Sequence, residues 1–598
     1  MADSIQALLI TPPFTQLNTP YPATAYLKGY LNTINVSSAQ ADLGIEVLLA
    51  VFSKEGLTHL YNCIEAGAYE LSQSNQRMVA LKQAYIASID PVISFLQNQD
   101  STLAYAISGR EYLPEGNRFE SLDDLEWAFG NLGTQDKARH LATLYLEDLS
   151  DLIKETVDPF FGFSRYAERI SMSSESFDEL YDCLNDAPTF IDDILFDLLA
   201  LKIQESPPVL VGLSVPFPGN LYSALRCGQY LKRNHPHIKI AMGGGYCNTE
   251  LRSLQDPRIF DFVDFITLDD GEGPLLKITQ LLAGEINVEE LERTHILEEE
   301  EVVYKNKIPN TIFHHRNLPA PSYKGLPFEK YISFLDVVNP MHRMWTDEKW
   351  NKLTISHGCY WKQCTFCDVN LDYIGNYQNT TAIDLVNKIE KIRAETGISG
   401  FHFVDEAAPP KMLRALSEEL LKRNISMRWW TNIRFEKTFD NELCQLMAKA
   451  GCVAVTGGLE VASDRLLIKM KKGIDIGQVA RVTKHFSNNG IMTHAYLMYG
   501  FPTQTEQETI DSLEVVRQLF EEGCVKSAFW HQFTTTIHSP IGKNPDEYNI
   551  KITGPKFEGF AQNDLWHEDP TGADHPKYTK GLNLALHNYL NGVGFDIP

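Results

Sequence analysis

The residues Leu353-Thr-Ile-Ser-His-Gly-Cys359-Tyr-Trp-Lys-Gln-Cys364-Thr-Phe-Cys367 decide how the whole chain is interpreted. An apolar, strand-like run leads directly into three clustered cysteines. A 4Fe-4S cluster normally takes four cysteine ligands, so three thiolates leave one iron open for a small molecule. The stretch therefore favours a metal centre that takes part in chemistry.

A structural zinc site is the alternative interpretation of the same residues. Cys364-Thr-Phe-Cys367 has the spacing of a zinc knuckle, and His357 offers a further ligand. Structural zinc sites usually combine two separated ligand pairs and fill all four positions. No second cysteine pair lies nearby in the sequence. The spacing by itself leaves both interpretations open.

Composition limits the classes of function. A chain of 598 residues is too long for one core, and its length suggests about three to five domains. The formal charge of −25 argues against a broad grip on nucleic acid, so no nucleic-acid partner is expected. The sequence contains no run of roughly eighteen apolar residues, which a membrane span would need. Its ten cysteines are too few for a disulfide scaffold. We expect a cytoplasmic protein without a membrane partner.

The first third of the chain has the pattern of an α/β unit with a helical insertion. A strand at 7–10, a helix at 23–31 and a short strand ending at Asp42 begin a doubly wound sheet. Between about residues 44 and 204, apolar residues recur at helical spacing. This stretch is too long for a connection and predicts an inserted helical domain. The α/β pattern resumes with the apolar run 209–215, which suits a strand buried on both faces.

Repeated strand and helix patterns follow the cysteines. They predict a parallel sheet curled into a full or partial barrel, with its chemistry at the carboxyl ends of the strands. The predicted fold class is α/β, with a Rossmann-like domain at 1–43 and 205–316, a helical insertion at 44–204, a linker at 317–352, a partial (β/α) barrel at 353–522 and a C-terminal extension at 523–598.

The cysteine stretch and the motifs behind it resemble the radical S-adenosylmethionine (SAM) enzymes. The usual spacing in that family is three residues and then two, whereas four residues separate Cys359 from Cys364. We expect the extra residue among 360–363 to bulge outward while the sulfurs keep their positions. The resemblance implies that Cys359, Cys364 and Cys367 hold a 4Fe-4S cluster.

The resemblance also implies a SAM site at the ends of successive strands. An acidic element in the family meets the SAM amino group, which needs a carboxylate or carbonyl acceptor. An arginine binds the SAM carboxylate in two contacts, a glutamate accepts ribose hydroxyls, and an aromatic residue lies near the adenine. The residues implied as SAM contacts are Phe366, Asp405, Glu406, Arg434, Glu460 and Ser463.

Glycines that follow the early strands resemble the cobalamin-binding Rossmann domain that precedes many radical SAM domains. Glycines in this place let a backbone approach a ligand closely. The residues implied around the corrin are Ser214, Gly243, Gly244, Gly245 and Glu272. The Asp-x-His-x-x-Gly signature that supplies a histidine to cobalt in the cobalamin mutases is absent, so the lower cobalt face has no assigned ligand.

These motifs predict a cobalamin-dependent radical SAM enzyme that cleaves SAM reductively and methylates an unactivated carbon. A small-molecule or peptide substrate and an external electron donor, such as a flavodoxin or ferredoxin, would be its partners. The alternatives are a radical SAM enzyme that catalyses cyclisation or rearrangement, one that lacks cobalamin, and a zinc-containing binding or regulatory protein. The sequence assigns no catalytic residue, and the C-terminal extension receives no chemical role.

Overall fold

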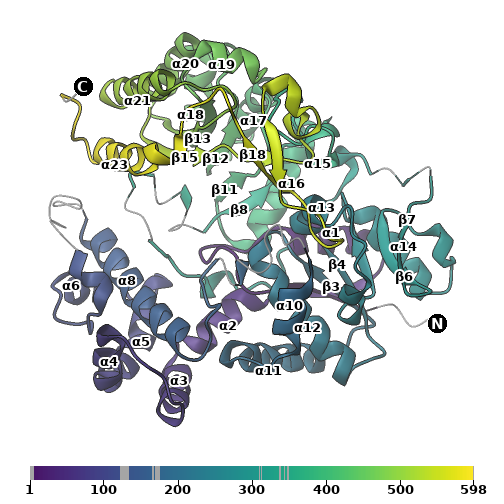
Figure 1. Cartoon of the computed structure of the whole chain (residues 1–598). Coiled ribbons are helices and arrows are strands. Elements are labelled where there is room, and N and C mark those ends of the chain that lie inside the picture. The colour runs from purple at the N-terminus through teal and green to yellow at the C-terminus, as the bar shows by residue number, and fades with distance from the viewer. Residues whose placement is uncertain are drawn as a thin grey trace.

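The computed structural model describes residues 6–121, 133–164, 167–168, 176–308, 310–311, 313–335, 339–341, 344–345 and 349–596. Two large sheets organise these residues, one of seven and one of six strands. Figure 1 shows the six-stranded sheet with its helices at the top, the seven-stranded sheet at the lower right, and a group of helices at the lower left.

The seven-stranded sheet has the order β2-β1-β3-β4-β5-β6-β7. Its first five strands are parallel, and the last two continue the sheet as an antiparallel pair. The strands are β1 (Gln6–Thr11), β2 (Ser37–Asp42), β3 (Leu210–Ser214), β4 (Lys239–Gly243), β5 (Phe265–Thr267), β6 (Thr294–Glu298) and β7 (Glu301–Lys305).

Both faces of this sheet are covered, as its apolar strands require. Leu8 and Ile10 of β1 point into one core, whereas Ala7 and Leu9 point into the core on the opposite face, as the two-residue period of a strand dictates. Helices α11 (Phe190–Glu205) and α12 (Leu221–Asn234) cover the first face. Helices α1 (Ala23–Thr33) and α14 (Glu272–Leu282) cover the second face.

The helices between β2 and β3 share a core with the sheet. They begin with α2 (Leu43–Val51), include α3 (Lys54–Ala66), α5 (Lys82–Leu96) and α8 (Thr134–Glu155), and end with α11. Residues of all of them belong to the core that also contains Leu8 and Val211 of the sheet. The insertion therefore extends one side of the sheet instead of forming a core of its own.

The six-stranded sheet has the order β15-β14-β13-β12-β11-β8, and its paired strands are all parallel. Trp429 of β12 packs into the core under the outer helices, while the next residue, Trp430, faces the inner side of the sheet. The strands are β8 (Asn351–Leu353), β11 (Gly400–Phe403), β12 (Arg428–Ile433), β13 (Cys452–Glu460), β14 (Met492–Tyr499) and β15 (Ser527–Gln532).

Five helices connect and cover the strands of this partial barrel. They are α16 (Ala382–Thr396), α17 (Pro410–Lys422), α18 (Asn441–Lys449), α20 (Ile476–Asn488) and α21 (Glu506–Glu521). The edge strand β15 pairs with β14 although it lies beyond residue 522, where the sequence analysis ended the domain. Its short apolar pattern does not distinguish a sixth barrel strand from a strand of the extension, so only the pairing assigns it.

The remaining C-terminal segment connects the two sheets. A small sheet of β16 (Thr535–Thr536), β17 (Lys551–Gly554) and β18 (Asp564–Glu568) lies beside the barrel. Between its strands, Gly559 accepts backbone hydrogen bonds from Gln255 and Asp256, and the Gln562 amide donates to Glu250. Figure 1 shows this yellow segment running from the barrel to the helix α13 (Gly245–Glu250) of the first domain.

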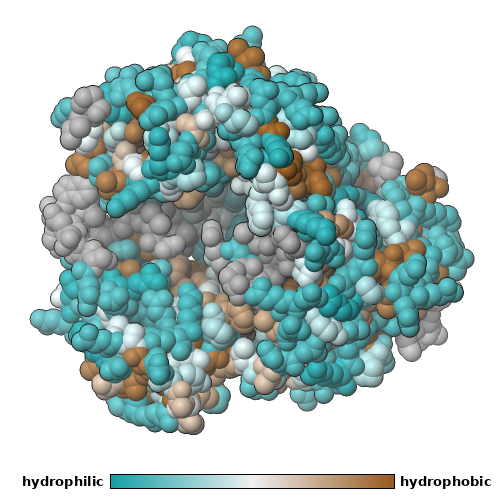
Figure 2. Space-filling model, in the orientation of Figure 1, coloured by the Kyte–Doolittle hydropathy of each residue, from teal (hydrophilic) through white to brown (hydrophobic). Residues whose placement is uncertain are grey.

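No single described helix is both long and apolar enough to cross a membrane, although α4 (Gln73–Ala80) and α5 together are, as a pair bent by 80°. On the face in Figure 2, hydrophobic residues form scattered small groups on a mainly hydrophilic surface.

Candidate functional site

The cysteine loop follows β9 (Ser356–His357) and lies at the carboxyl end of the barrel sheet. Its backbone is held from three sides: the Cys359 amide donates to Ile374, the Thr365 amide donates to Met470, and Thr365 accepts from Ile541. All three cysteines line one cavity of about 240 Å³. The loop therefore presents the three thiols to a common space.

The additional residue between the first two cysteines lies on the surface. Lys362 has a left-handed backbone conformation, with φ of 51°, and both Lys362 and Gln363 are exposed. A left-handed residue turns the chain sharply and takes up the extra length. This arrangement fits the expected outward bulge, because Cys359 still faces the same cavity as Cys364 and Cys367.

Two cations lie beside the buried cysteines. The Arg434 guanidinium is 3.9 Å from the Cys364 sulfur, and its face stacks on the Trp361 ring at 4.2 Å. A hydrogen bond from Cys367, together with the charges of Lys472 and Arg434, lowers the pKa of the Cys364 thiol although burial opposes this shift. The same hydrogen bond, together with burial, raises the pKa of the Cys367 thiol, so Cys364 is the member of this pair that favours the thiolate form that binds a metal.

Arg434 already has several partners. Besides the cysteine contact, its Nε donates to Glu436 at 3.1 Å, and its Nη2 donates to the Lys472 carbonyl oxygen. The side chain is 5% exposed. Arg434 therefore stands in the cavity wall as a fixed positive charge, with little freedom to reorient toward a ligand.

The two acidic residues after β11 point to different places. Glu406 lines the cysteine cavity, and burial with the neighbouring Asp405 charge raises the pKa of Glu406 to about 7. Asp405 does not line this cavity. Its carboxylate accepts the amides of Ile355 at 2.8 Å and Ser356 at 2.7 Å, so Asp405 holds the turn that leads into the cysteine loop.

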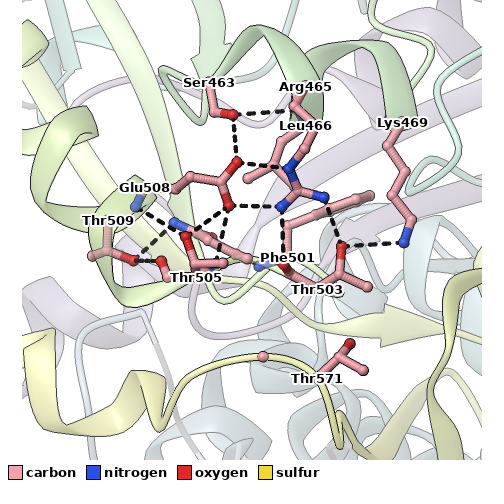
Figure 3. Close-up of polar contacts among 12 residues, drawn as sticks. Ser463, Arg465, Leu466, Lys469, Phe501, Thr503, Thr505, Glu508, Thr509 and Thr571 are labelled. Carbon is pink, nitrogen blue, oxygen red and sulfur yellow. Dashed lines mark hydrogen bonds and ion pairs between the residues drawn. The ribbon is translucent and has the colours of Figure 1, made fainter.

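Ser463 is likewise directed away from the cavity. Its hydroxyl caps the helix α19 (Asp464–Lys469) by accepting the Leu466 amide, and it donates to Glu508 at 2.8 Å. Figure 3 shows Ser463 and Arg465 converging on the Glu508 carboxylate. Among the six residues implied as SAM contacts, four line the cavity, namely Phe366, Glu406, Arg434 and Glu460, whereas Asp405 and Ser463 do not.

The sequence analysis did not single out several other residues of the cavity wall. The largest omission is Lys472, which lies in the loop after α19 and forms an ion pair with Glu460 at 2.6 Å. Its position within a lysine-rich segment gives no signal that it is buried while Lys471 is exposed. Asn432, Thr456 and Tyr496 also line the cavity, and each comes from the inner side of a barrel strand.

A second and larger cavity, of about 560 Å³, lies between the two sheets. Its floor is formed by the carboxyl ends of β3 and β4 and by the loop after β5, and its opposite wall includes Thr354 and Val404 of the barrel side. The five residues implied around cobalamin all line it, namely Ser214, Gly243, Gly244, Gly245 and Glu272. Burial and the nearby Asp270 carboxylate raise the pKa of Glu272 to about 7.

The glycine loop of this cavity requires glycine at one position for conformational reasons. Gly244 has φ of 113°, and a Cβ added there would lie 2.6 Å from the Val215 carbonyl oxygen. No other residue adopts this backbone region readily. The requirement explains why a glycine follows β4 and leaves an uncovered backbone at the cavity floor.

His357 belongs to the larger cavity and not to the cysteine cavity. Its Nε2 is 2.9 Å from Asp270 and its Nδ1 is 2.6 Å from the Asn376 carbonyl oxygen. Asp372 lies close enough to make a three-residue group of metal-ligating types with them. Because both ring nitrogens have partners, His357 links the two domains and does not supply a fourth ligand beside the three cysteines.

Neighbouring residues of the same segments line the two cavities. Tyr373 lines the larger cavity while the next residue, Ile374, lines the cysteine cavity. At the end of β11, Val404 lines the larger cavity and Glu406 lines the cysteine cavity. A ligand in the larger cavity would therefore lie next to the mouth of the cysteine cavity.

Comparison with known proteins identifies the barrel. Residues 353–516 match the model of the radical SAM superfamily. The chain is 23% identical over 333 residues to an uncharacterized methyltransferase of Pyrococcus horikoshii. The aligned region covers 55% of this chain and 68% of the relative. It is 24% identical over 364 residues to the anaerobic magnesium-protoporphyrin IX monomethyl ester cyclase of Rubrivivax gelatinosus, with 57% and 59% coverage.

A solved structure matches almost the whole chain. It is the radical SAM methyltransferase TsrM from Kitasatospora setae with cobalamin and a [4Fe-4S] cluster bound, with a TM-score of 0.55 and 13% identity over 98% of this chain and 91% of that chain. At this identity the likeness concerns the fold. The predicted fold class, an α/β chain with a Rossmann-like sheet before a partial barrel, is confirmed.

Proposed function

Because residues 353–516 belong to the radical SAM superfamily, we propose that this protein is a cobalamin-dependent radical SAM enzyme that methylates an unactivated carbon. The observation that carries the proposal is the pair of adjoining cavities, one lined by three cysteines and the other by the glycine loops of a Rossmann-like sheet. The methyltransferase named among the relatives and the cobalamin named for the solved structure support it.

The cysteine cavity fits a 4Fe-4S cluster by the chemistry of its donors. Three thiols converge there beside two cations, and His357 belongs to another cavity. Three cysteines are the ligand set of a cluster with one open iron, whereas a closed zinc site needs four ligands. Cys359, Cys364 and Cys367 would hold the cluster, and the charges of Lys472 and Arg434 help to lower the pKa of the Cys364 thiol.

The same cavity offers groups for SAM. Glu406 and Glu460 supply carboxylates, and Phe366 supplies an aromatic surface. Of the acidic pair after β11, we assign Glu406 to the SAM amino group, because Asp405 is occupied by backbone amides. Ser463 has no place in this assignment, since its hydroxyl is held by Glu508.

The larger cavity suits a flat, extended cofactor by its size and by its floor of exposed backbone. Ser214 and the glycines 243–245 would lie under cobalamin, and Glu272, partly protonated at neutral pH, would donate a hydrogen bond. When bound, the cluster supplies the electron that cleaves SAM, and cobalamin carries the methyl group. The chain itself would position both groups at the adjoining cavities.

Cyclisation is the second candidate function, since one relative is named an anaerobic magnesium-protoporphyrin IX monomethyl ester cyclase. It uses the same cluster and the same two cavities. The substrate, either a small molecule or a peptide, and an external one-electron donor such as a flavodoxin or ferredoxin remain part of the proposal.

The first test is anaerobic reconstitution of the full chain with iron, sulfide and hydroxocobalamin, followed by desalting. We expect about four irons per chain and about one cobalamin. The variant Cys364→Ala should lose most of the iron, while Cys452→Ala, which removes a buried cysteine from the start of β13, should retain it. Iron retention by Cys364→Ala at the wild-type level, or zinc in place of iron, would refute the cluster assignment.

The second test separates methyl transfer from cyclisation. The reconstituted protein is reduced with dithionite and given SAM that carries a deuterated methyl group, and cobalamin is then analysed by mass spectrometry. A trideuteromethyl group on cobalamin supports methyl transfer. Cleavage of SAM with unlabelled cobalamin would reject the methyl carrier and favour the second candidate function.

A further inference from the structure

Glu460 and Lys472 form a buried ion pair in the wall of the cysteine cavity. The Lys472 ammonium is 2.6 Å from the Glu460 carboxylate, and the side chains of Lys472 and Glu460 are only 9% and 10% exposed. Glu460 ends the strand β13, and Lys472 comes from the loop after α19. Burying two charges is costly unless they are paired and well placed, so this location needs a reason.

The backbone around Glu460 is shaped for the pair. Glu460 has φ of 63°, in the left-handed region, and the pairing between β13 and β14 shifts register between Gly458 and Glu460. A Cβ on Gly458 would lie 1.9 Å from Glu460 Oε1 and 2.7 Å from Lys472 Nζ. A left-handed residue, a strand irregularity and a glycine thus all serve to bring this carboxylate to this ammonium.

The pair faces the cysteines. Lys472 lines the same cavity as Cys364 and Cys367, and its ammonium lies 5.5 Å from the Phe366 ring centroid, next to Cys367 in the sequence. The Lys472 carbonyl oxygen accepts Arg434 Nη2, so both cations of the wall are held in one network. The 2.6 Å contact with the Glu460 carboxylate pairs the buried Lys472 ammonium with an opposite charge.

We propose that the Lys472–Glu460 pair sets the reduction potential of the cluster held by Cys359, Cys364 and Cys367. This inference rests on the proposed function, since it requires the cluster. Reduction adds one electron, and hence one negative charge, to the cluster, while the thiolate ligands stay bound. A buried ammonium stabilises that charge with little screening by water, and Glu460 offsets part of the effect.

Lys472 is a positioning residue in this scheme, because it acts on the cluster through its charge and breaks no bond. The electron comes from a one-electron donor, which is dithionite in the experiment below. The sign of the effect differs for the two residues: loss of the ammonium makes reduction harder, whereas loss of the carboxylate makes it easier. A residue with a merely structural role would not produce opposite shifts.

The experiment is a redox titration of the reconstituted full-length protein without SAM, in which electron paramagnetic resonance measures the reduced cluster. For Lys472→Met we expect the equilibrium constant for reduction to fall about tenfold, which lowers the midpoint potential by about 59 mV for one electron. Glu460→Gln should raise the potential. Lys472→Arg, which keeps the charge, should stay near the wild type.

Lys471→Met is the matched control, because it makes the same substitution at the adjacent but exposed lysine. An equal potential in Lys472→Met and Lys471→Met would overturn the inference. If Lys472→Met assembles no cluster, Glu460→Gln decides the matter, and a potential that does not rise overturns the inference. A wild-type protein without any cluster signal would instead refute the proposed function.

Discussion

The cysteine cavity and the larger cavity between the sheets lie side by side, yet their walls are built differently. The wall of the smaller, of about 240 Å³, contains charged side chains that bind one another, such as Glu460 with Lys472. The larger, of about 560 Å³, has a floor of glycine backbone and apolar residues such as Leu213 and Met242. Paired side chains form part of the wall of the smaller cavity. The floor of the larger cavity is largely backbone, because its glycines have no side chains.

This difference has a physical basis. A charged group in a buried wall must be paired before a ligand arrives, because an unpaired buried charge is expensive. A wall of backbone and apolar groups carries no such penalty and accepts a broad ligand by shape. Substitutions of the paired charges should therefore act through electrostatics, and substitutions of the glycines should act through backbone shape.

Gly244→Ala tests the glycine floor of the larger cavity. The new Cβ would lie 2.6 Å from the Val215 carbonyl oxygen, at a φ of 113° that alanine avoids, so the loop that forms the cavity floor must move. We expect cobalamin retained after desalting to fall by about tenfold or more, which corresponds to about 1.4 kcal/mol of binding free energy. Absorbance of the desalted protein measures it.

Gly284→Ala is the control for Gly244→Ala. Gly284 also has a positive φ, of 72°, but a Cβ there meets nothing within 4 Å, and the residue follows α14 outside the cavity. The control should retain cobalamin. If both variants retain it equally, the glycine loop does not form the cobalamin floor.

Glu272→Gln tests the pH dependence of one acid of the larger cavity, which Asp269 and Asp270 also line. Burial and Asp270 raise the pKa of Glu272 to about 7, so between pH 4.5 and 7 the folded protein holds a proton that the unfolded chain has released. Wild-type stability should therefore fall as the pH rises through this window. At pH 8 the variant avoids the cost of the buried charge and should gain up to about 3 kcal/mol.

Thermal unfolding at pH 8 and at pH 5 measures this prediction. The gain of Glu272→Gln over wild type should be full at pH 8 and fall to about a quarter of that value at pH 5. Glu285→Gln, at an exposed glutamate just after α14, controls for the change in net charge. An equal gain at both pH values would contradict the proposed protonation of Glu272.

The smallest effect is expected from Ser463→Ala, which sharpens the boundary of the cysteine cavity. The change removes the cap of α19 and the hydrogen bond to Glu508, so stability should fall by about 1 kcal/mol. SAM affinity, measured by equilibrium dialysis, should stay unchanged because Ser463 does not line the cavity.

Thr381→Ala removes a comparable helix cap, at the start of the distant helix α16, and provides the reference for loss of a cap alone. Weaker SAM binding in Ser463→Ala than in Thr381→Ala would indicate that Ser463 contacts SAM.

The sequence by itself was sufficient for the features that depend on local patterns. Periods of two and of 3.6 residues revealed the alternation of strands and helices, and the grouping of cysteines 359, 364 and 367 indicated a metal centre. Glycines after strands indicated the second site, because a glycine in that place has few purposes other than a turn or a close approach.

Only the tertiary structure decided which neighbours in the sequence face a cavity. Asp405 and Glu406 are adjacent acids, yet one binds backbone amides while the other lines the cavity, and Lys471 and Lys472 divide in the same way between solvent and cavity. Pairing of β15 with β14 and the ion pair between Glu460 and Lys472 join residues from separate elements. Local propensity carries no information about such contacts, because the direction of a side chain at a strand end or in a loop is set by what packs against it.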